Sequence, residues 1–235
     1  MNENGKISRI LGAAFLLQFV TSFSSGAFLR PLWLVPDSAS QSMLNIANSP
    51  WTIRLNILVD MVTAMGIIFL GAMLFLTLRK QSEKIALTGL GLYILEAVLL
   101  AASRMAAFSL LGISQAYAAG GNAADLQVQW NLSLASMDFA GSTLHMLAFS
   151  CGGILFYYLL NRSRIVPRPL SLWGLITVIP CLAGTLLSIF GTPVPILVYI
   201  PYMPFELVIG IWILIKGVKE AAQTAPQAVL KGEAA

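Results

Sequence analysis

Long apolar stretches alternate with short polar segments along the whole sequence. The apolar stretches cover residues 10–28, 51–78, 85–112, 130–160, 170–190 and 202–215. A helix of about 20 apolar residues crosses the hydrocarbon core of a bilayer, and five of the six stretches reach or approach that length. The sixth is shorter, although residues 199–204 extend it. This pattern predicts an all-α fold, a polytopic bundle of six transmembrane helices.

The polar segments between these stretches differ in character. Residues 29–50 hold three prolines and several Ser and Asn residues, which predicts an ordered loop. The small residues of 114–129 predict a second loop. After a transmembrane domain at 1–216, the polar segment 217–235 is predicted to be a disordered cytoplasmic tail. Residues 10–28 could also be a cleaved signal peptide, but the apolar region of such a peptide is shorter, which favours an uncleaved span.

Some side chains near these loops have predicted positions. Met43, Leu44 and Ile46 form a short amphipathic piece that we expect on the surface. Trp33 and Trp130 are expected at the outer boundary of the bilayer, because Trp is enriched where hydrocarbon meets water.

The composition agrees with a membrane protein. Hydrophobic residues make up 57% of the chain and charged residues only 10%, whereas charged residues make up about 25% of typical soluble domains. The net charge of +4 does not indicate nucleic-acid binding, because the basic residues lie at the ends of apolar stretches. With the amino terminus inside, only three of the fourteen Lys and Arg residues fall on the outer half: Arg30, Arg54 and Arg104. This excess of positive charge predicts that both termini are cytoplasmic.

The fourth stretch carries polar residues at a regular spacing. Asn131, Asp138 and the single His of the chain, His145, are seven residues apart, so on a regular helix they lie on one face. Such a face is unfavourable against lipid when it carries an Asp within the membrane. We therefore expect it to contact other helices or a polar cavity.

Acidic residues occur in four of the predicted spans. They are Asp60, Glu96, Asp138 and Glu206. At a rise of about 1.5 Å per residue, each lies about 10–16 Å from the nearer face of the bilayer. Arg54 and Arg104 lie closer to the outer face, and His145 lies deeper. A charge at the centre of a transmembrane helix costs about 2.5–3.5 kcal/mol on insertion scales. We therefore predict an outward-opening pocket in which the carboxylates and His145 bind a ligand, with the two arginines at its mouth.

A purely structural role is the main alternative for this polar cluster, since the arginines could pair with carboxylates and hold the bundle together. Two arginines cannot neutralise four carboxylates, however, and a fully ionised buried network is costly. Motifs for metal or nucleotide chemistry are missing, because the chain has one His and no HExxH, GxxxxGK[ST] or GxGxxG sequence. We therefore expect no metal site and no cofactor.

Five segments distributed along the chain form a further pattern. They are Arg9 with Gly12, RLNILVDM at 54–61, LEAVLL at 95–100, RSRIVPRPLSLWG at 162–174 and PFELVIGIWILIKG at 204–217. Together they resemble a widespread bacterial family of six-span membrane proteins grouped as a domain of unknown function. The resemblance covers nearly the whole chain. It implies a multi-pass protein of the bacterial cytoplasmic (inner) membrane, and it implies no substrate.

Three functions are compatible with these observations. The first is the binding, with translocation as a further step, of a small polar or amphiphilic molecule in the pocket. The second is a membrane-embedded enzyme that uses carboxylate acid–base chemistry on a lipid or isoprenoid, which two carboxylates beside a cavity lined by Phe and Trp would favour. The third is a non-catalytic membrane subunit or sensor. The predicted partners are the lipid bilayer and a small molecule or lipid, and not nucleic acid.

Overall fold

The computed structural model describes residues 3–218 as helices joined by short connections, with no strand in that range. The helices are α1 (Glu3–Ser24), η1 (Ser25–Leu29), η2 (Arg30–Leu32), α2 (Ala39–Asn48), α3 (Pro50–Leu78), α4 (Glu83–Ala118), α5 (Ala123–Asp138), η3 (Phe139–Leu144), α6 (His145–Ser163), α7 (Arg168–Ile189), η4 (Ile196–Val198) and α8 (Met203–Lys216). Six of the resulting continuous segments are long and apolar enough to cross a membrane. The predicted all-α, six-span fold is therefore confirmed. Most of the predicted tail at 217–235 lies outside the described residues.

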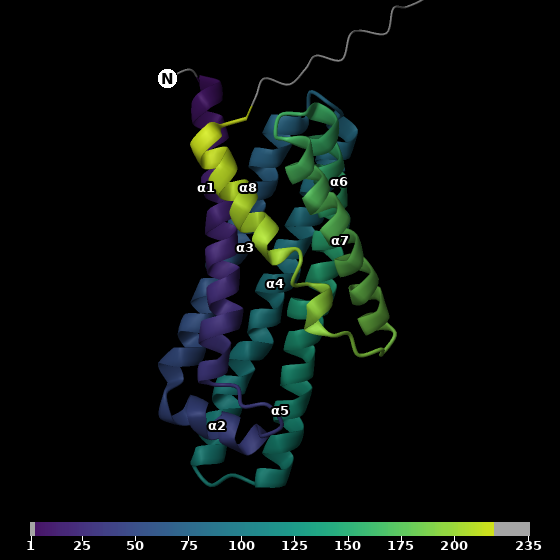
Figure 1. Cartoon of the computed structure of the whole chain (residues 1–235). Helices are drawn as coiled ribbons and strands as arrows, with labels where there is room; N and C mark the ends of the chain where they lie inside the picture. The colour runs from purple at the N-terminus through teal and green to yellow at the C-terminus, as the bar shows by residue number, and fades with distance from the viewer. Residues whose placement is uncertain (1–2, 219–235) are drawn as a thin grey trace, which may run out of the picture.

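The long helices run side by side along one axis, as Figure 1 shows. The start of α1 and the end of α8 lie at the same end of the bundle, which we call the terminal end. The helix α2 and the connection between α4 and α5 lie at the opposite end, which we call the distal end. The connection between α7 and α8 lies part-way along the bundle. For this reason α8 covers only the half of α1 that is nearer the terminal end (Figure 1).

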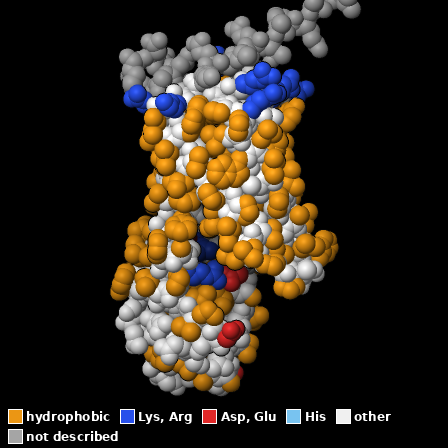
Figure 2. Space-filling model, in the orientation of Figure 1, with side chains coloured by type: hydrophobic (Ala, Val, Ile, Leu, Met, Phe, Trp, Pro, Cys, Tyr) orange, Lys and Arg blue, Asp and Glu red, His pale blue; other side chains and the backbone are white. Residues whose placement is uncertain are grey.

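The bundle is longer than a bilayer is thick. The helix α4 has 36 residues and is therefore about 54 Å long, compared with about 30 Å for a hydrocarbon core. Figure 2 shows hydrophobic side chains in a band around the part of the bundle nearer the terminal end, whereas the distal end carries fewer. The distal end is thus an extension beyond the apolar band.

The distal extension has its own hydrophobic core. Trp33, Met43, Ile46 and Trp130 are 0–1% exposed and pack together there with buried residues of α3, α4 and α5. Two expectations were therefore wrong. The two tryptophans do not lie at a lipid boundary, and Met43 and Ile46 of α2 point into the protein, while Leu44 alone of the amphipathic piece is 37% exposed.

The second predicted loop is also much shorter than expected. Residues 114–129 were predicted to be irregular, but α4 continues to Ala118 and α5 begins at Ala123. The connection is closed by Gly120, whose φ of 85° suits glycine. The side chain of Asn122 then accepts a hydrogen bond from the backbone N–H of Ala124 (3.1 Å) and caps α5. The Ala and Gln residues on both sides of this connection favour helix. Their helix propensity explains why most of the segment is helical although its small residues suggested a loop.

Candidate functional site

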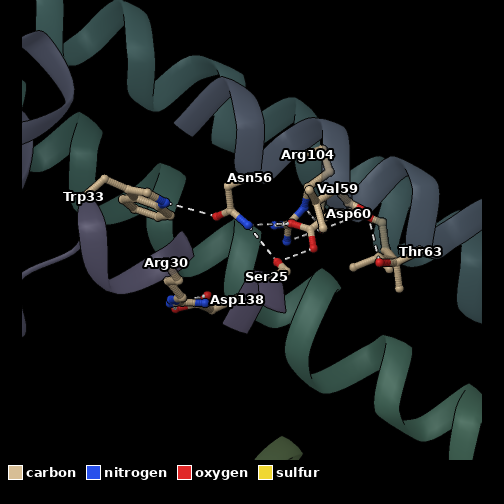
Figure 3. A network of polar contacts seen from close by, with 11 residues as sticks. Ser25, Arg30, Trp33, Asn56, Val59, Asp60, Thr63, Arg104 and Asp138 are labelled. Atoms are coloured by element: carbon tan, nitrogen blue, oxygen red, sulfur yellow. Dashed lines mark hydrogen bonds and ion pairs between the residues drawn. The ribbon is translucent and has the colours of Figure 1, made fainter. Parts of the chain in front are cut away.

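Asp60 on α3 is the centre of a buried hydrogen-bond network (Figure 3). Its carboxylate accepts hydrogen bonds from Arg104 on α4 (NH1 to Oδ2, 2.6 Å), from Asn56 on α3 (Nδ2 to Oδ2, 3.3 Å) and from the hydroxyl of Ser25 in η1. The side chains of Asp60 and Arg104 are only 6% and 11% exposed. The ion pair is therefore well shielded from solvent, and its carboxylate accepts hydrogen bonds from donors in three helical segments.

The network extends in both directions from Asp60. The side-chain amide of Asn56 donates to the hydroxyl of Ser25 (2.7 Å) and accepts a hydrogen bond from the indole Nε1 of Trp33 (3.0 Å). The guanidinium of Arg104 donates from Nε and NH2 to the hydroxyl of Ser103 (2.9 and 2.8 Å). We call Ser25, Trp33, Asn56, Asp60, Ser103 and Arg104 the Asp60 network. It connects the end of the first span to α3, α4 and the distal core.

A second ion pair lies beside this network in Figure 3. The guanidinium NH2 of Arg30, in η2, lies 2.8 Å from both carboxylate oxygens of Asp138, at the end of α5. These two side chains are 30% and 39% exposed. Figure 2 shows basic and acidic side chains reaching the surface together at mid-height, in a hollow below the apolar band. Arg30 was not among the site residues predicted from the sequence, because its position in a loop does not indicate which span it meets.

The pair of Asp60 and Arg104 lies far from the terminal end of the bundle. Measured along the helix from Glu83, at the terminal end of α4, Arg104 is about 31 Å away, which is the whole thickness of a hydrocarbon core. Asp60 is likewise about 27 Å from Leu78, at the end of α3.

A π-helical segment separates Asp138 from His145. The segment η3 interrupts the fourth span between α5 and α6, and a π-turn holds one residue more than an α-turn. The spacing of seven therefore does not keep Asp138 and His145 on one face, although Asn131 and Asp138 both lie on the regular helix α5. Asn131 is exposed, Asp138 meets Arg30, and His145 points toward Glu96.

Gly141 allows η3 to pack closely on α4. A Cβ atom added at Gly141 would lie 2.6 Å from NH2 of Arg104 and 2.9 Å from Cβ of Ser103. These distances are too short for a real side chain. The π-helical segment thus contacts the Asp60 network, and it also lines a cavity together with Glu96 and Glu206.

This cavity has a volume of about 600 Å³ and lies between α1, η3–α6, α7–η4 and α8. We call it the glutamate cavity because Glu96 of α4 and Glu206 of α8 both line it. His145 also lines it, with its Nε2 3.9 Å from Oε1 of Glu96. The hydroxyl of Tyr202 donates to Oε1 of Glu206 (2.9 Å) and is itself hydrogen-bonded to Tyr157. Two carboxyl groups from different helices therefore share this space.

Several polar atoms on the cavity wall have no hydrogen-bond partner among the described residues. They are Oε2 of Glu96, Nδ1 of His145 and Oε1 of Gln18. Glu96 is 2% exposed and Gln18 is 8% exposed. More than nine in ten buried polar groups in proteins are hydrogen-bonded, so these side chains have unused hydrogen-bonding capacity beside the cavity.

The rest of the cavity wall is largely apolar and aromatic. Phe19 and Phe23 of α1 face Phe149 of α6 and residues of the α7–α8 connection across the space. α1 packs mainly on α3 and α8, whereas α7 packs mainly on α6, so the cavity separates α1 from α7. Phe23 is 38% exposed and Ile196 70% exposed. These exposed wall residues mark an opening at the side of the bundle.

The seven residues proposed from the sequence therefore do not surround one pocket. Glu96, Glu206 and His145 line the glutamate cavity. Asp60 and Asp138 are each paired with an arginine instead. Arg54 is exposed on α3 and takes part in none of the ion pairs formed by the described residues. Within residues 3–218, no three His, Cys, Asp or Glu side chains are grouped so that they could hold a metal ion.

The six spans and the polar groups buried between them define a multi-pass helical membrane protein. A family model described as "Domain of unknown function (DUF4386)" matches residues 10–217, and the chain belongs to this family. The resemblance found in the sequence is thereby confirmed at the level of the family. A search of curated proteins and a search of solved structures found no match to this chain.

Proposed function

We propose that this protein binds a small amphiphilic molecule in the glutamate cavity. The polar group of that molecule would lie against Glu96, Glu206 and His145, and its apolar part against the phenylalanines of α1 and α6. The observation that carries this proposal is the combination of two buried carboxyl groups, one of them with an unpartnered oxygen, and an apolar wall that opens sideways. The volume falls within the range of about 300–1,000 Å³ that is usual for small-molecule sites.

Asp60 and Asp138 have a different role in this proposal. Each carboxylate is hydrogen-bonded to an arginine and neither lines the cavity. We assign these pairs to holding the first span, α3, α4 and α5 together at the edge of the apolar band. This assignment replaces the four-carboxylate pocket inferred from the sequence.

The orientation of the protein completes the proposal. Exposed basic residues gather at the terminal end, where Figure 2 shows blue side chains; they include Arg79, Lys80, Arg162, Arg164 and Arg168. By the positive-inside rule this end faces the cytoplasm of a bacterial cell, and the cavity opens toward the outer half of the inner membrane. A green fluorescent protein fused after residue 235 should therefore fluoresce, and alkaline phosphatase fused there should be inactive. The reverse result would invert the orientation.

Filling the cavity should prevent amphiphile binding. Gly26 lines the cavity and has nothing within 4 Å of an added Cβ, so Gly26→Phe should enter the opening without straining the backbone. We would incubate the full-length protein in phosphatidylcholine nanodiscs with dodecanol, dodecylamine and dodecanoate, each carrying a photoreactive diazirine on its chain. Cross-links to residues 18–27 and 194–206 should form with at least one of these probes, and Gly26→Phe should reduce them about tenfold.

Gly91→Phe is the matched control for this experiment. Gly91 on α4 also has nothing within 4 Å of an added Cβ, but it does not line the cavity. Its replacement should leave the cavity cross-links unchanged. If none of the three probes cross-links to the cavity wall above the level on other lipid-facing helices, the binding proposal is wrong and the third function, a non-catalytic subunit, is favoured.

A specific observation also supports the enzymatic alternative. Two carboxyl groups adjoin a cavity with Phe19, Phe23 and Phe149 in its wall, which is the arrangement that acid chemistry on an apolar substrate requires. No Trp lines this cavity among the described residues, in contrast to the expectation for such an enzyme. Mass spectrometry of lipids from cells with and without the protein separates the alternatives, because an enzyme changes a lipid species and a binding protein does not.

A further inference from the structure

We infer that the molecule bound in the glutamate cavity carries a primary ammonium group on an apolar chain. This inference rests on the proposed binding function and names the class of ligand. It follows from the charges that line the cavity, from the kind of hydrogen-bonding atoms left unpartnered there, and from the nature of the walls.

The charges that line the cavity favour a cation. Two glutamates contribute to the wall, and none of the described residues lining it is Lys or Arg. The other two acidic residues of the predicted site have a basic partner. Asp60 and Asp138 each form an ion pair with an arginine, at 2.6–2.8 Å. The imidazole Nε2 of His145 lies 3.9 Å from Oε1 of Glu96. A buried carboxylate is stabilised by a paired positive charge, and an anionic head group would face two carboxylates without compensation.

The unpartnered atoms favour a group with several N–H donors. The free oxygen of Glu96 is a hydrogen-bond acceptor, and this side chain, which lines the cavity, is 2% exposed. A primary ammonium has three donors and no acceptor. It can therefore donate to Glu96 and still has donors for Glu206. A quaternary ammonium has the same charge but no N–H group, so it leaves the oxygen of Glu96 unpartnered.

The walls favour a ligand in which the cation is attached to an apolar chain. Phe19, Phe23, Phe149, Tyr199 and Tyr202 all line the cavity. Aromatic faces attract cations when water is excluded, and the same rings provide apolar surface for a chain that leaves through the side opening. An inorganic cation would use none of this surface. The cavity sets no upper limit on the length of the ligand's apolar chain, because that chain can extend through the opening into the membrane.

Competition between matched amphiphiles tests the inference. The photoreactive dodecylamine is bound to the full-length protein in phosphatidylcholine nanodiscs, and unlabelled dodecylammonium, dodecyltrimethylammonium, dodecanol or dodecanoate is added as competitor. Dodecylammonium should halve the cavity cross-links at a concentration about tenfold or more below that of the other three. A desolvated charge pair commonly contributes more than the 1.4 kcal/mol to which a tenfold change corresponds.

Two variants connect this preference to the carboxyl groups. Glu96→Gln and Glu206→Gln keep the size of the side chain and remove the charge, so each should abolish the advantage of dodecylammonium over dodecanol. Cross-linking by photoreactive dodecanol should persist in both variants, which shows that the cavity is still formed. Glu83→Gln is the matched control, because Glu83 is exposed on the same helix as Glu96, and it should retain the preference.

The possible failures of the two proposals are distinct. If dodecanol or dodecanoate competes as well as dodecylammonium, or if both Gln variants keep the preference, the ammonium inference is wrong although amphiphile binding stands. If dodecyltrimethylammonium competes equally well, the hydrogen-bond argument fails and the assignment to a primary ammonium is overturned. If no photoreactive probe reaches the cavity wall, both the binding function and the ligand class are wrong.

Discussion

Replacing Arg104 by methionine should destabilise the protein by about 3–5 kcal/mol. Methionine fills part of the same space with an apolar side chain, but the carboxylate of Asp60 stays buried without its cation. Only Asn56 and Ser25 remain as donors to that carboxylate, and two neutral hydrogen bonds do not compensate a buried charge. Thermal unfolding of the purified variant in detergent micelles, followed by loss of soluble protein, measures the change.

The second ion pair provides a control of the same chemistry at a different burial. Arg30→Met removes the partner of Asp138, but these side chains are 30% and 39% exposed, compared with 11% and 6% in the Arg104–Asp60 pair. Solvent can replace the lost contact, so the expected cost is at most about 1 kcal/mol. The double variant Asp60→Asn with Arg104→Met should recover much of the stability lost in Arg104→Met. Equal losses in the two arginine variants would contradict the argument from burial.

Replacing Gly12 by alanine should also destabilise the protein, by about 1–3 kcal/mol. A Cβ added to Gly12 would lie 2.8 Å from Cα of Leu214 and 2.9 Å from the backbone oxygen of Gly210, both on α8. These are backbone atoms, so no change of rotamer relieves the contact and α1 and α8 must separate. Small residues at such a crossing let transmembrane helices pack closely. Close packing matters in a membrane because an apolar helix surface contacts lipid as favourably as it contacts another apolar helix.

The effect of Gly12→Ala should extend to the glutamate cavity. Glu206 and Tyr202 belong to α8 and its connection, and both line the cavity. Displacement of α8 should therefore reduce cavity cross-links by the photoreactive dodecylamine together with the unfolding temperature. Gly91→Ala is the control: with nothing within 4 Å of the added Cβ, it should be neutral or stabilise the helix by about 0.5–1 kcal/mol. If Gly12→Ala behaves like Gly91→Ala, the close crossing does not limit stability.

The quoted segments that resemble the family take on specific roles in the structure. RLNILVDM at 54–61 contains Asn56 and Asp60 of the Asp60 network, and LEAVLL at 95–100 contains Glu96. The segment at 204–217 contains Glu206 and the part of α8 that meets Gly12. The sequence thus indicated which stretches carry the polar groups. It did not indicate that they divide into a charge-paired network and a cavity.

The amino-acid sequence alone determined the helical class, the six spans and their approximate limits. These properties depend on the local composition of each stretch, because a backbone in lipid must satisfy its own hydrogen bonds and a helix does so within the segment. It also located every buried acidic residue, since an Asp or Glu within an apolar stretch is visible without knowledge of its neighbours.

Only the tertiary structure decided which of these residues meet. Spacing along one helix does not predict a π-helical segment such as η3, which separates Asp138 from His145. Nor does hydropathy show that α3 and α4 extend beyond the apolar band. The partners of Glu96 and Glu206 depend on the position of α8, and that position is set by the backbone contact at Gly12. Ion pairs and cavities arise from packing between helices, which is a long-range property of the folded chain.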